Sequence, residues 1–420
     1  MEPKVEKNVF KQIFRDHWEE FQGKNSRYQT EYYTKIIRKM LGCGDIANGY
    51  IVYRCLSCGE EKKVAFSCKS SFCLTCAKVY TDKWVDYVGE ALFEGVRYRH
   101  VVLTVPEEYR RYFYDDSELL DELMRTGHAF YKDLVSEWLK EAIEVGSIVV
   151  LQTAGRSGNY NPHLHILETS GGLTGKGKWK GFGYIDYKLL HKKWQYHLLG
   201  MLKEKIGTPE IKAQVDRSWK KYRKGFVAYI EKGDVPAGGK GLARYLAKYV
   251  VSPPISIRRI IKYDGKRVRY WYNDHKTGQR IEEEITALEF IGRMTQHILP
   301  KGFQRIRHYG LHAICKASKI REQLKEVLKI AEQPVSEETY QVEGNTYRNR
   351  IKKSFGVDPL KCPKCDEEME FEGIWHPDYG WIVDKFDEFF VDDIQLEKKE
   401  EEHVRREEPM VPVQMCFVWE

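Results

Sequence analysis

The sequence has no long hydrophobic run and no secretion signal. No stretch approaches the ~18 consecutive apolar residues that a membrane-spanning helix needs. The first ten residues, MEPKVEKNVF, are charged where a signal peptide would have an apolar centre. We therefore expect a soluble, cytoplasmic protein without a membrane partner.

Signatures of nucleotide binding and of repeats are also missing. The 420 residues contain no Gly-x4-Gly-Lys-Ser/Thr run, whose backbone would cradle the phosphates of ATP, and no internal repeat. Any reaction of this protein must therefore draw its energy from a source other than a P-loop ATPase site.

Charge is unevenly distributed along the chain. The net charge is +7, but residues 176–270 hold about 24 Lys and Arg against about 7 acids, and residues 366–409 hold about 17 acids against about 5 bases. This asymmetry predicts a middle that binds a polyanion and an acidic tail. A solvated lysine-rich face is the alternative. Aromatic residues interleaved with the bases favour single-stranded nucleic acid, because bases stack on aromatic rings.

Ten cysteines occur mostly as Cys-x-x-Cys pairs, which favours zinc in a reducing compartment over disulfides. Cys55 and Cys58 are followed after 14 residues by Cys73 and Cys76, a near-ideal spacing for one tetrahedral Zn²⁺ site, with Cys68 as a fifth candidate ligand. Cys362-Pro-Lys-Cys365 is half a site with no second cysteine pair after it, and whether it binds metal stays open.

The stretch around His163-Leu164-His165 predicts a hairpin with strands at 147–153 and 163–169. Residues i and i+2 of a strand share a face, so both imidazoles point the same way while Leu164 points into the core. Gln152, near the end of the first strand, could supply a third, oxygen ligand to a metal ion. Exposed alternation without a metal is the alternative for this stretch alone.

A second stretch, 237–254, begins with a glycine-rich entry, continues with helical periodicity and ends at Pro253-Pro254. Tyr245 and Tyr249 are four residues apart and share one helix face, as do Arg244 and Lys248. Such a pair is usually a packing pair. Beside two histidines it suggests phosphoryl transfer, in which a tyrosine hydroxyl attacks a phosphate polarised by a metal ion.

Together these pieces resemble the two-tyrosine HUH endonucleases and, more closely, the rolling-circle transposases of insertion sequence family ninety-one. The similarity covers residues ~10 to ~370 and depends on the order and spacing of several motifs rather than on one of them. The matching motifs are CLSCGEE (55–61), SCKSSFCLTCA (67–77), RHVVLTVP (99–106), QTAGRSGNYNPHLHIL (152–167), ARYLAKYVVSPPIS (243–256) and FIGRMTQHILPKGFQRIRHYG (290–310). Relatives often have a histidine just before the third paired cysteine, where this chain has Phe72.

The resemblance implies Mg²⁺ or Mn²⁺ at the two histidines, nucleophilic tyrosines at 245 and 249, and cleavage of single-stranded DNA at element ends and targets. Host replication machinery is a further partner that it implies. Basic side chains are expected to contact the DNA, namely Arg244, Lys248, Arg258, Arg259, Arg305 and Arg307.

The fold class expected is α+β, with an HUH-like central antiparallel sheet and flanking helices after a helical zinc-binding module. We expect three domains: a helical and zinc-binding domain at 1–95, a catalytic domain at 96–330, and a C-terminal extension at 331–420. The motif at 286–313 has no assignable chemistry, and its histidines are expected to pack rather than to bind metal.

Two other functions remain open at this point. A plasmid replication initiator or relaxase would use the same chemistry, but the zinc module and the 286–313 motif favour a transposase. A zinc-dependent DNA-binding regulator without catalysis would explain the cysteines and the basic middle, yet it would leave the His-x-His pair and the tyrosine pair without a role.

Overall fold

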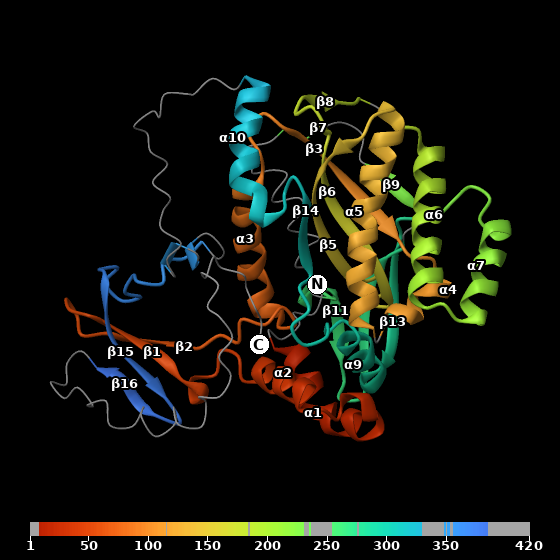
Figure 1. Cartoon of the computed structure of the whole chain (residues 1–420). Coiled ribbons are helices and arrows are strands. Elements are labelled where there is room, and N and C mark those ends of the chain that lie inside the picture. Colours follow the sequence, from red (N-terminus) through yellow and green to blue (C-terminus); the bar gives the residue numbers. More distant parts are fainter. Residues whose placement is uncertain are drawn as a thin grey trace, which may run out of the picture. The chain divides into compact units, whose positions relative to one another are not determined.

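The structure is a computed structural model of the chain (Figure 1). It describes residues 8–114, 116–183, 185–230, 235–236, 254–274, 277–329, 348–349, 351–352 and 356–384. The chain divides into two units, each made of two separate segments. Unit 1 comprises Met1–Lys24 and Tyr80–Thr339, and unit 2 comprises Asn25–Val79 and Tyr340–Glu420.

These units differ from the three sequential domains expected from the sequence. The segment 1–95 is split, because its first helix, α1 (Val9–Lys24), packs on α9 (Ala287–Thr295) in unit 1. The segment 331–420 contributes strands to the cysteine-rich unit 2 instead of standing alone. Both differences arise from pairing between distant segments, which local sequence patterns do not reveal.

A six-stranded antiparallel sheet forms the centre of unit 1, in the order β10-β3-β6-β5-β14 with β9 also paired to β3. Its strands are β3 (Arg97–Thr104), β5 (Gly146–Ala154), β6 (Tyr160–Thr169), β9 (Ala228–Ile230), β10 (Val235–Pro236) and β14 (Ile306–Gly310). The expected antiparallel sheet with flanking helices is therefore confirmed, and the chain has a mixed α/β fold.

The predicted hairpin is the β5–β6 pair at the middle of this sheet. Its turn is closed by the Gly155 N–H, which donates to the Asn159 carbonyl at 2.9 Å. Gly158 adopts a φ of 83°, a left-handed conformation that glycine takes without a steric penalty. The register places Gln152 opposite His163 and Val150 opposite His165.

Helices α5 (Ser117–Leu139) and α6 (Tyr187–Lys205) cover one face of the sheet (Figure 1). Alternation along β6 sends Leu164 and Ile166 into this core. The helix approaches closely because position 127 is glycine, where a Cβ would lie 2.6 Å from Leu164 Cδ1. Any larger residue at position 127 would therefore push α5 away from β6.

The opposite face, which carries His163 and His165, is covered at one end by α3 (Leu74–Ala91) and α10 (Ala317–Leu328). Ile148 and Leu167 pack there with Val88, Leu92 and Leu324. The histidines lie further along the same face, beyond this apolar cluster.

Two smaller sheets complete unit 1. A turn at Asp264-Gly265 joins the first two strands of one of them, and Gly265 has a φ of 92°. The strands are β11 (Ile260–Tyr263), β12 (Arg267–Asn273) and β13 (Arg280–Thr286) in one sheet, and β4 (Ile143–Glu144), β7 (Gly171–Thr174) and β8 (Trp179–Gly181) in the other.

Unit 2 contains a four-stranded antiparallel sheet in the order β16-β15-β1-β2. Its core is small and includes Tyr53, Cys55, Cys362 and Met369. A core of this size needs additional stabilisation, for which metal ions are a common solution. The elements are α2 (Glu31–Leu41), β1 (Tyr50–Cys55), β2 (Glu61–Ala65), β15 (Met369–His376) and β16 (Gly380–Asp384).

Further helices and turns connect these elements. They are α4 (Glu107–Arg110), α7 (Pro209–Lys221) and the 3-10 turns η1 (Ser26–Tyr28), η2 (Ile46–Asn48), η3 (Arg111–Phe113), η4 (Ile257–Arg259) and η5 (Ile314–Lys316). Within the described ranges, none of the helices has the length and apolar character required to span a membrane.

Candidate active site and cysteine clusters

His163 and His165 lie side by side on one face of β6. Their ring centroids are 5.0 Å apart with the planes inclined by 66°. His165 is only 5% exposed, whereas His163 is half-buried. Gln152, directly opposite His163 on β5, faces the same side of the sheet. The three predicted ligand residues are therefore brought together.

Hydrogen bonds fix the orientation of the His163 ring. Its Nδ1 lies 2.7 Å from the Asn161 carbonyl oxygen, which can only accept, so Nδ1 carries the proton. The lone pair of a neutral His163 then resides on Nε2, the nitrogen further from the backbone. A metal-binding histidine is commonly oriented in this way.

A third histidine, which the sequence did not single out, contacts His165. His100 on β3 places its Nε2 2.9 Å from His165 Nδ1, and the two rings stack with centroids 5.2 Å apart and planes inclined by 8°. The motif RHVVLTVP contains it. In the sequence, His100 directly precedes an apolar run at 101–103, but only the pairing of β3 with β6 brings it to His165.

Burial keeps the three imidazoles neutral. It lowers the pKa of His163 and lowers that of His165 well below the ordinary value, with the neighbouring histidines adding to the effect on His165. Burial also lowers the pKa of His100 to about 4. Neutral imidazoles have the lone pairs that a cation would need, so the donor set fits a divalent ion.

The predicted nucleophiles, Tyr245 and Tyr249, and the neighbouring Arg244 and Lys248 lie outside the described residues, in the range 237–253. Their roles remain predictions from the sequence.

The four other arginines predicted to contact DNA have different surroundings. Arg258 is exposed, and Arg259 lies over the Trp271 ring at 5.7 Å. Burial and the nearby positive charge of Arg156 lower the pKa of Arg259, so two cations gather beside the β5–β6 turn. Arg305 is half-buried, and its carbonyl accepts from Leu151 N–H at 2.9 Å.

One terminal nitrogen of Arg307 donates to both carboxylate oxygens of Asp121 on α5, at 2.7 and 2.9 Å. Its position in β14, opposite Val149, directs it to the helix-covered face of the sheet and away from the histidines. Arg307 therefore lies on the other face from the proposed metal site, and its contact with DNA stays a prediction from the sequence.

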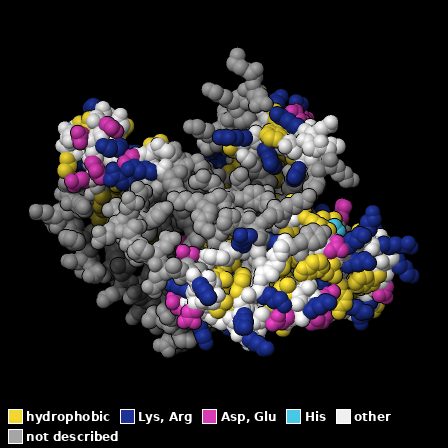
Figure 2. Space-filling model, turned by 90° about the horizontal axis from the view of Figure 1, so that it is seen from above, with side chains coloured by type: hydrophobic (Ala, Val, Ile, Leu, Met, Phe, Trp, Pro, Cys, Tyr) yellow, Lys and Arg dark blue, Asp and Glu magenta, His cyan; other side chains and the backbone are white. Residues whose placement is uncertain are grey.

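The basic middle of the chain forms an exposed surface on α6 and α7. On the right of Figure 2, where these helices lie, Lys and Arg side chains surround hydrophobic ones. Exposed cations include Lys188, Lys192, Lys212, Lys220, Arg223 and Lys224. The expectation that aromatics alternate with them on the surface holds for Tyr196 and Trp219, but Trp194 and Phe182 are buried in the core.

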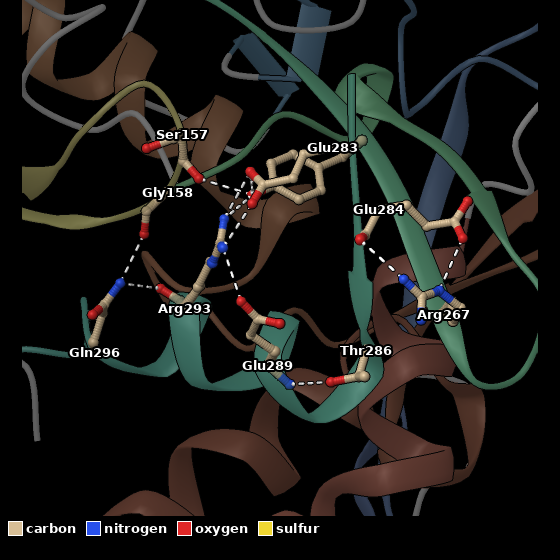
Figure 3. A network of polar contacts seen from close by, with 10 residues as sticks. Ser157, Gly158, Arg267, Glu283, Glu284, Thr286, Glu289, Arg293 and Gln296 are labelled. Carbon is tan, nitrogen blue, oxygen red and sulfur yellow. Dashed lines mark hydrogen bonds and ion pairs between the residues drawn. The ribbon is translucent and has the colours of Figure 1, made fainter. Parts of the chain in front are cut away.

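Helix α9 holds the turn of the β5–β6 hairpin (Figure 3). Gln296 Nε2 donates to the Gly158 carbonyl at 2.8 Å. The Tyr270 hydroxyl lies within hydrogen-bond distance of two acceptors, the Ser157 carbonyl oxygen at 3.0 Å and Glu283 Oε2 at 2.8 Å, and its single proton can donate to either. Both terminal nitrogens of Arg293 donate to the Glu283 carboxylate, at 2.7 and 2.9 Å. This gives the 286–313 motif a structural role, because it anchors the turn between Gln152 and His163.

The histidines of that motif make internal contacts, as expected. His297 donates from Nε2 to the Gly158 carbonyl at 2.9 Å and accepts at Nδ1 from Thr153 Oγ1 at 3.2 Å. His308 contacts Tyr87, and His312 stacks on Phe93 with centroids 4.3 Å apart.

Eight of the nine cysteines that the structure describes form two separate groups of four. Cys43, Cys68, Cys73 and Cys76 make one group, and Cys55, Cys58, Cys362 and Cys365 make the other. Within each, the sulfur atoms all lie within 4.8 Å of one another. The single site predicted from Cys55, Cys58, Cys73 and Cys76 is wrong, because β1–β15 pairing carries a distant cysteine pair to Cys55 and Cys58.

In the first group, Cys43 and Cys68 take the places that the sequence prediction gave to Cys55 and Cys58. Cys43 and Cys68 each place their Sγ within 3.6 Å of Cys76 Sγ, at 3.5 and 3.6 Å. The neighbouring thiols Cys43 and Cys68 hold the pKa of Cys73 well below its ordinary value. Cys43 has no partner cysteine nearby in the sequence, so spacing alone could not have revealed it.

Comparison with known proteins identifies the class. Residues 146–319 match the family model described as "Putative transposase", and residues 13–105 match "Transposase zinc-binding domain". Both matched models describe transposases, in agreement with the resemblance to insertion sequence family ninety-one that the motifs indicate.

Two similar relatives support this. The "Transposase for insertion sequence element IS801" of Pseudomonas savastanoi pv. phaseolicola is 28% identical over 347 residues, which cover 80% of this chain and 82% of the relative. "Putative transposase y4qJ" of Sinorhizobium fredii is 25% identical over 391 residues, covering 88% and 97% respectively. No solved structure matches the chain.

Proposed function

We propose that this transposase nicks and rejoins single-stranded DNA through a 5′-phosphotyrosine intermediate, with an HUH-type site at His163, His165 and Gln152. The observation that supports this best is the cross-strand arrangement of the three side chains on one sheet face. The tyrosine pair at 245 and 249, in the sequence motif that follows, supplies the nucleophiles.

The residues at the site fit a divalent cation. The Asn161 carbonyl orients His163 with its lone pair on Nε2, and His100 can do the same for His165 by accepting from its Nδ1–H. The Gln152 amide oxygen completes a mixed nitrogen and oxygen set suited to Mn²⁺ or Mg²⁺. Such an ion, when bound, withdraws charge from the scissile phosphate.

The tyrosine performs the chemical step. Its hydroxyl oxygen forms a bond to phosphorus, the bond from phosphorus to the 3′ oxygen breaks, and that oxygen takes a proton as the tyrosine loses one. Because an unperturbed tyrosine has a pKa near ~10, it needs help to lose its proton at neutral pH. Arg244 and Lys248, four residues apart on the same helix, are the cations that stabilise the phenolate.

Two tyrosines allow strand transfer. One holds the first 5′ end while the other opens a second strand, and the freed 3′ hydroxyl attacks the phosphotyrosine or primes replication by host enzymes. The energy of the broken phosphodiester is kept in the tyrosyl ester, which agrees with the absence of an ATP-binding motif.

For the zinc-binding domain, we assign the ion to Cys43, Cys68, Cys73 and Cys76, which lie within the matched residues 13–105. Four thiolates leave no open coordination position, so this ion would be structural. For the DNA, we assign contacts to Arg258, Arg259 and Arg305 together with the basic surface of α6 and α7.

The test is incubation of the purified chain with single-stranded oligonucleotides from the element ends and Mn²⁺. We expect cleavage and a covalent adduct that peptide mass analysis places on Tyr245 or Tyr249. His163→Ala and His165→Ala should abolish the adduct while zinc content and circular dichroism stay unchanged. Gln152→Ala should cleave but require more Mn²⁺, because a neutral amide is a weaker ligand.

Substitution of the tyrosines separates the mechanism from its rivals. Tyr245→Phe or Tyr249→Phe should leave some cleavage and strongly reduce transposition, and the double variant should form no adduct. An adduct on another residue would overturn the mechanism, and intact oligonucleotides throughout would favour a non-catalytic regulator. Movement that needs only a plasmid origin and no element ends would favour a replication initiator.

A further inference from the structure

The C-terminal pair Cys362 and Cys365 lies against Cys55 and Cys58 in unit 2. Cys55 Sγ is 3.5 Å from Cys365 Sγ, Cys58 Sγ is 3.6 Å from Cys362 Sγ, and Cys58 and Cys365 are 3.5 Å apart. A tetrahedral zinc ion with Zn–S bonds of ~2.3 Å holds its sulfurs roughly 3.8 Å apart. A disulfide would need ~2.05 Å. The spacing therefore suits four thiolates around one ion.

The two pairs share one backbone design, although about 300 residues separate them. In each Cys-x-x-Cys-x stretch the N–H of the fifth residue donates to the carbonyl of the first cysteine, Gly59 to Cys55 at 2.8 Å and Asp366 to Cys362 at 3.0 Å. Both fifth residues are left-handed, with φ of 73° and 59°.

The first cysteine of each pair closes its turn in the same way. The Cys55 N–H donates to the backbone carbonyl of Glu60 at 2.9 Å, and the Cys362 N–H donates to the backbone carbonyl of Glu367 at 2.8 Å. The N–H of Lys364 also points at Cys362 Sγ, 3.4 Å away, and such bonds stabilise a thiolate. A non-glycine residue in the left-handed region, as at Asp366, is strained and persists where the surroundings require it.

Strand pairing fixes both turns relative to each other. β1 and β15 pair from Tyr50–Trp375 to Cys55–Met369, so each cysteine turn follows or precedes a paired strand end. Two guanidinium nitrogens of Arg54 donate to the Glu372 carboxylate at 2.6 and 3.0 Å, and Lys62 donates to the Pro359 carbonyl at 2.8 Å.

We propose that Cys55, Cys58, Cys362 and Cys365 bind a second Zn²⁺ ion, which fastens the C-terminal segment 356–384 to the N-terminal hairpin of unit 2. Cys362 and Cys365 lie beyond both matched ranges, 13–105 and 146–319. The ion is structural, because all four positions are thiolates. This inference concerns unit 2 alone and stands or falls separately from the cleavage mechanism.

The first experiment counts zinc in the full-length protein by native mass spectrometry and elemental analysis. We expect two ions per chain, one in Cys362→Ser/Cys365→Ser and one in Cys43→Ser/Cys68→Ser. Cys315→Ser, which changes an exposed cysteine outside both groups, should keep two. Two ions retained in the Cys362/Cys365 double variant would overturn the proposal, as would a single ion in the wild type that this variant retains.

A second measurement uses the unmodified chain, in case the double variant fails to fold. Iodoacetamide labelling read out by peptide mass should modify Cys315 rapidly and leave Cys55, Cys58, Cys362 and Cys365 protected. A chelator should expose these four at one common rate. Labelling of Cys362 and Cys365 at the Cys315 rate in zinc-loaded protein would overturn the proposal. Hydrogen exchange should rise in β1 and β15 together when the ion leaves.

Discussion

At the residue scale, the orientation of one ring decides what His165 can do. If His165 Nδ1–H donates to His100 Nε2, the His165 lone pair lies on Nε2, whereas the reverse direction would place a proton there. The 2.9 Å contact and the near-parallel stack allow His100 to impose the first arrangement. His100 is thus a positioning residue for the proposed cation site.

We therefore expect His100→Phe to weaken Mn²⁺ binding about 10-fold or more, the usual effect of losing a partner that orients a metal-binding histidine. His100→Gln should recover part of the affinity, because its amide oxygen can accept from His165 Nδ1–H. Electron paramagnetic resonance measures free Mn²⁺, and ¹⁵N shifts report the tautomer of His165.

The matched control is His308→Phe, which alters another histidine on the same sheet face whose partner is Tyr87. It should leave Mn²⁺ affinity unchanged. Equal Mn²⁺ affinity in wild type and His100→Phe would show that His100 has only a packing role.

At the scale of elements, α9 and the β12–β13 pair contact the turn of the β5–β6 hairpin, which carries the proposed metal ligands. Arg293 forms an ion pair with Glu283, and the Tyr270 hydroxyl lies between Glu283 and the Ser157 carbonyl. Gln296 donates a hydrogen bond to the Gly158 carbonyl (Figure 3). Since the turn connects Gln152 to His163, motion there changes the spacing of the proposed ligands. Small displacements of this kind weaken catalysis strongly.

Arg293→Gln should therefore reduce adduct formation and increase hydrogen exchange at residues 155–159. Its stability cost should be on the order of 1–3 kcal/mol, between the values for exposed and for buried ion pairs. Arg293→Lys should not restore activity fully, because an ammonium cannot make the bidentate contact.

Arg267→Gln is the matched control on the same small sheet. Arg267 pairs with Glu284, and both side chains are exposed to solvent, so its loss should cost little stability and leave the turn unchanged. Similar exchange at 155–159 in the two arginine variants would remove the anchoring role from α9.

The sequence was sufficient where the signal was local. The β5–β6 hairpin and the shared face of His163 and His165 follow from residue alternation and turn chemistry. The grouping of cysteines does not follow, because Cys362 and Cys365 reach Cys55 only through pairing of β1 with β15. His100 was missed for the same reason, since only the β3–β6 register brings it to His165.

At the scale of the whole molecule, buried histidines make the stability of unit 1 depend on pH. Burial lowers the pKa of His297 to about 4 and that of His312 to about 3. His128 and His308 are shifted in the same direction, each to about 4. Histidines of the unfolded chain have a pKa near ~6.5. Below that pH they bind protons, whereas the buried histidines of the folded unit stay neutral.

We expect the free energy of unfolding of unit 1 to fall as the pH falls from about 6.5 to about 4, by up to about 1.4 kcal/mol per pH unit for each buried histidine. Urea unfolding of zinc-loaded protein, followed through hydrogen exchange of α5 peptides, measures it. His312→Gln keeps a partner for the Tyr98 hydroxyl and should flatten the profile.

Glu168 provides a control of opposite sign. Burial raises its pKa well above the ordinary value, so its penalty grows as the pH rises above the unfolded pKa near ~4.3. Glu168→Gln should stabilise unit 1 at pH 7 and change little near pH 4. Several buried histidines outweigh this one carboxyl group. The free energy of unfolding of the wild-type unit 1 should therefore still fall as the pH falls. A flat wild-type profile between pH 7 and 5 would contradict this account.

We expect the basic surface of α6 and α7 to make DNA binding depend strongly on salt. Each phosphate neutralised in a single strand adds ~0.7 to the slope of log affinity against log salt, through release of counterions. Changing three exposed lysines of this surface to glutamine should lower that slope by about 2 if all three contact phosphates. The three are Lys212, Lys220 and Lys224.

The matched control removes the same charge from another helix, with Lys316, Lys319 and Lys325 changed to glutamine at and within α10. Fluorescence anisotropy of a labelled oligonucleotide across a salt series measures both variants. A slope that falls only in the α6–α7 variant places the strand on that surface. Equal falls in both would mean that net charge alone attracts the DNA, and an unchanged slope in the α6–α7 variant would mean that these lysines face solvent.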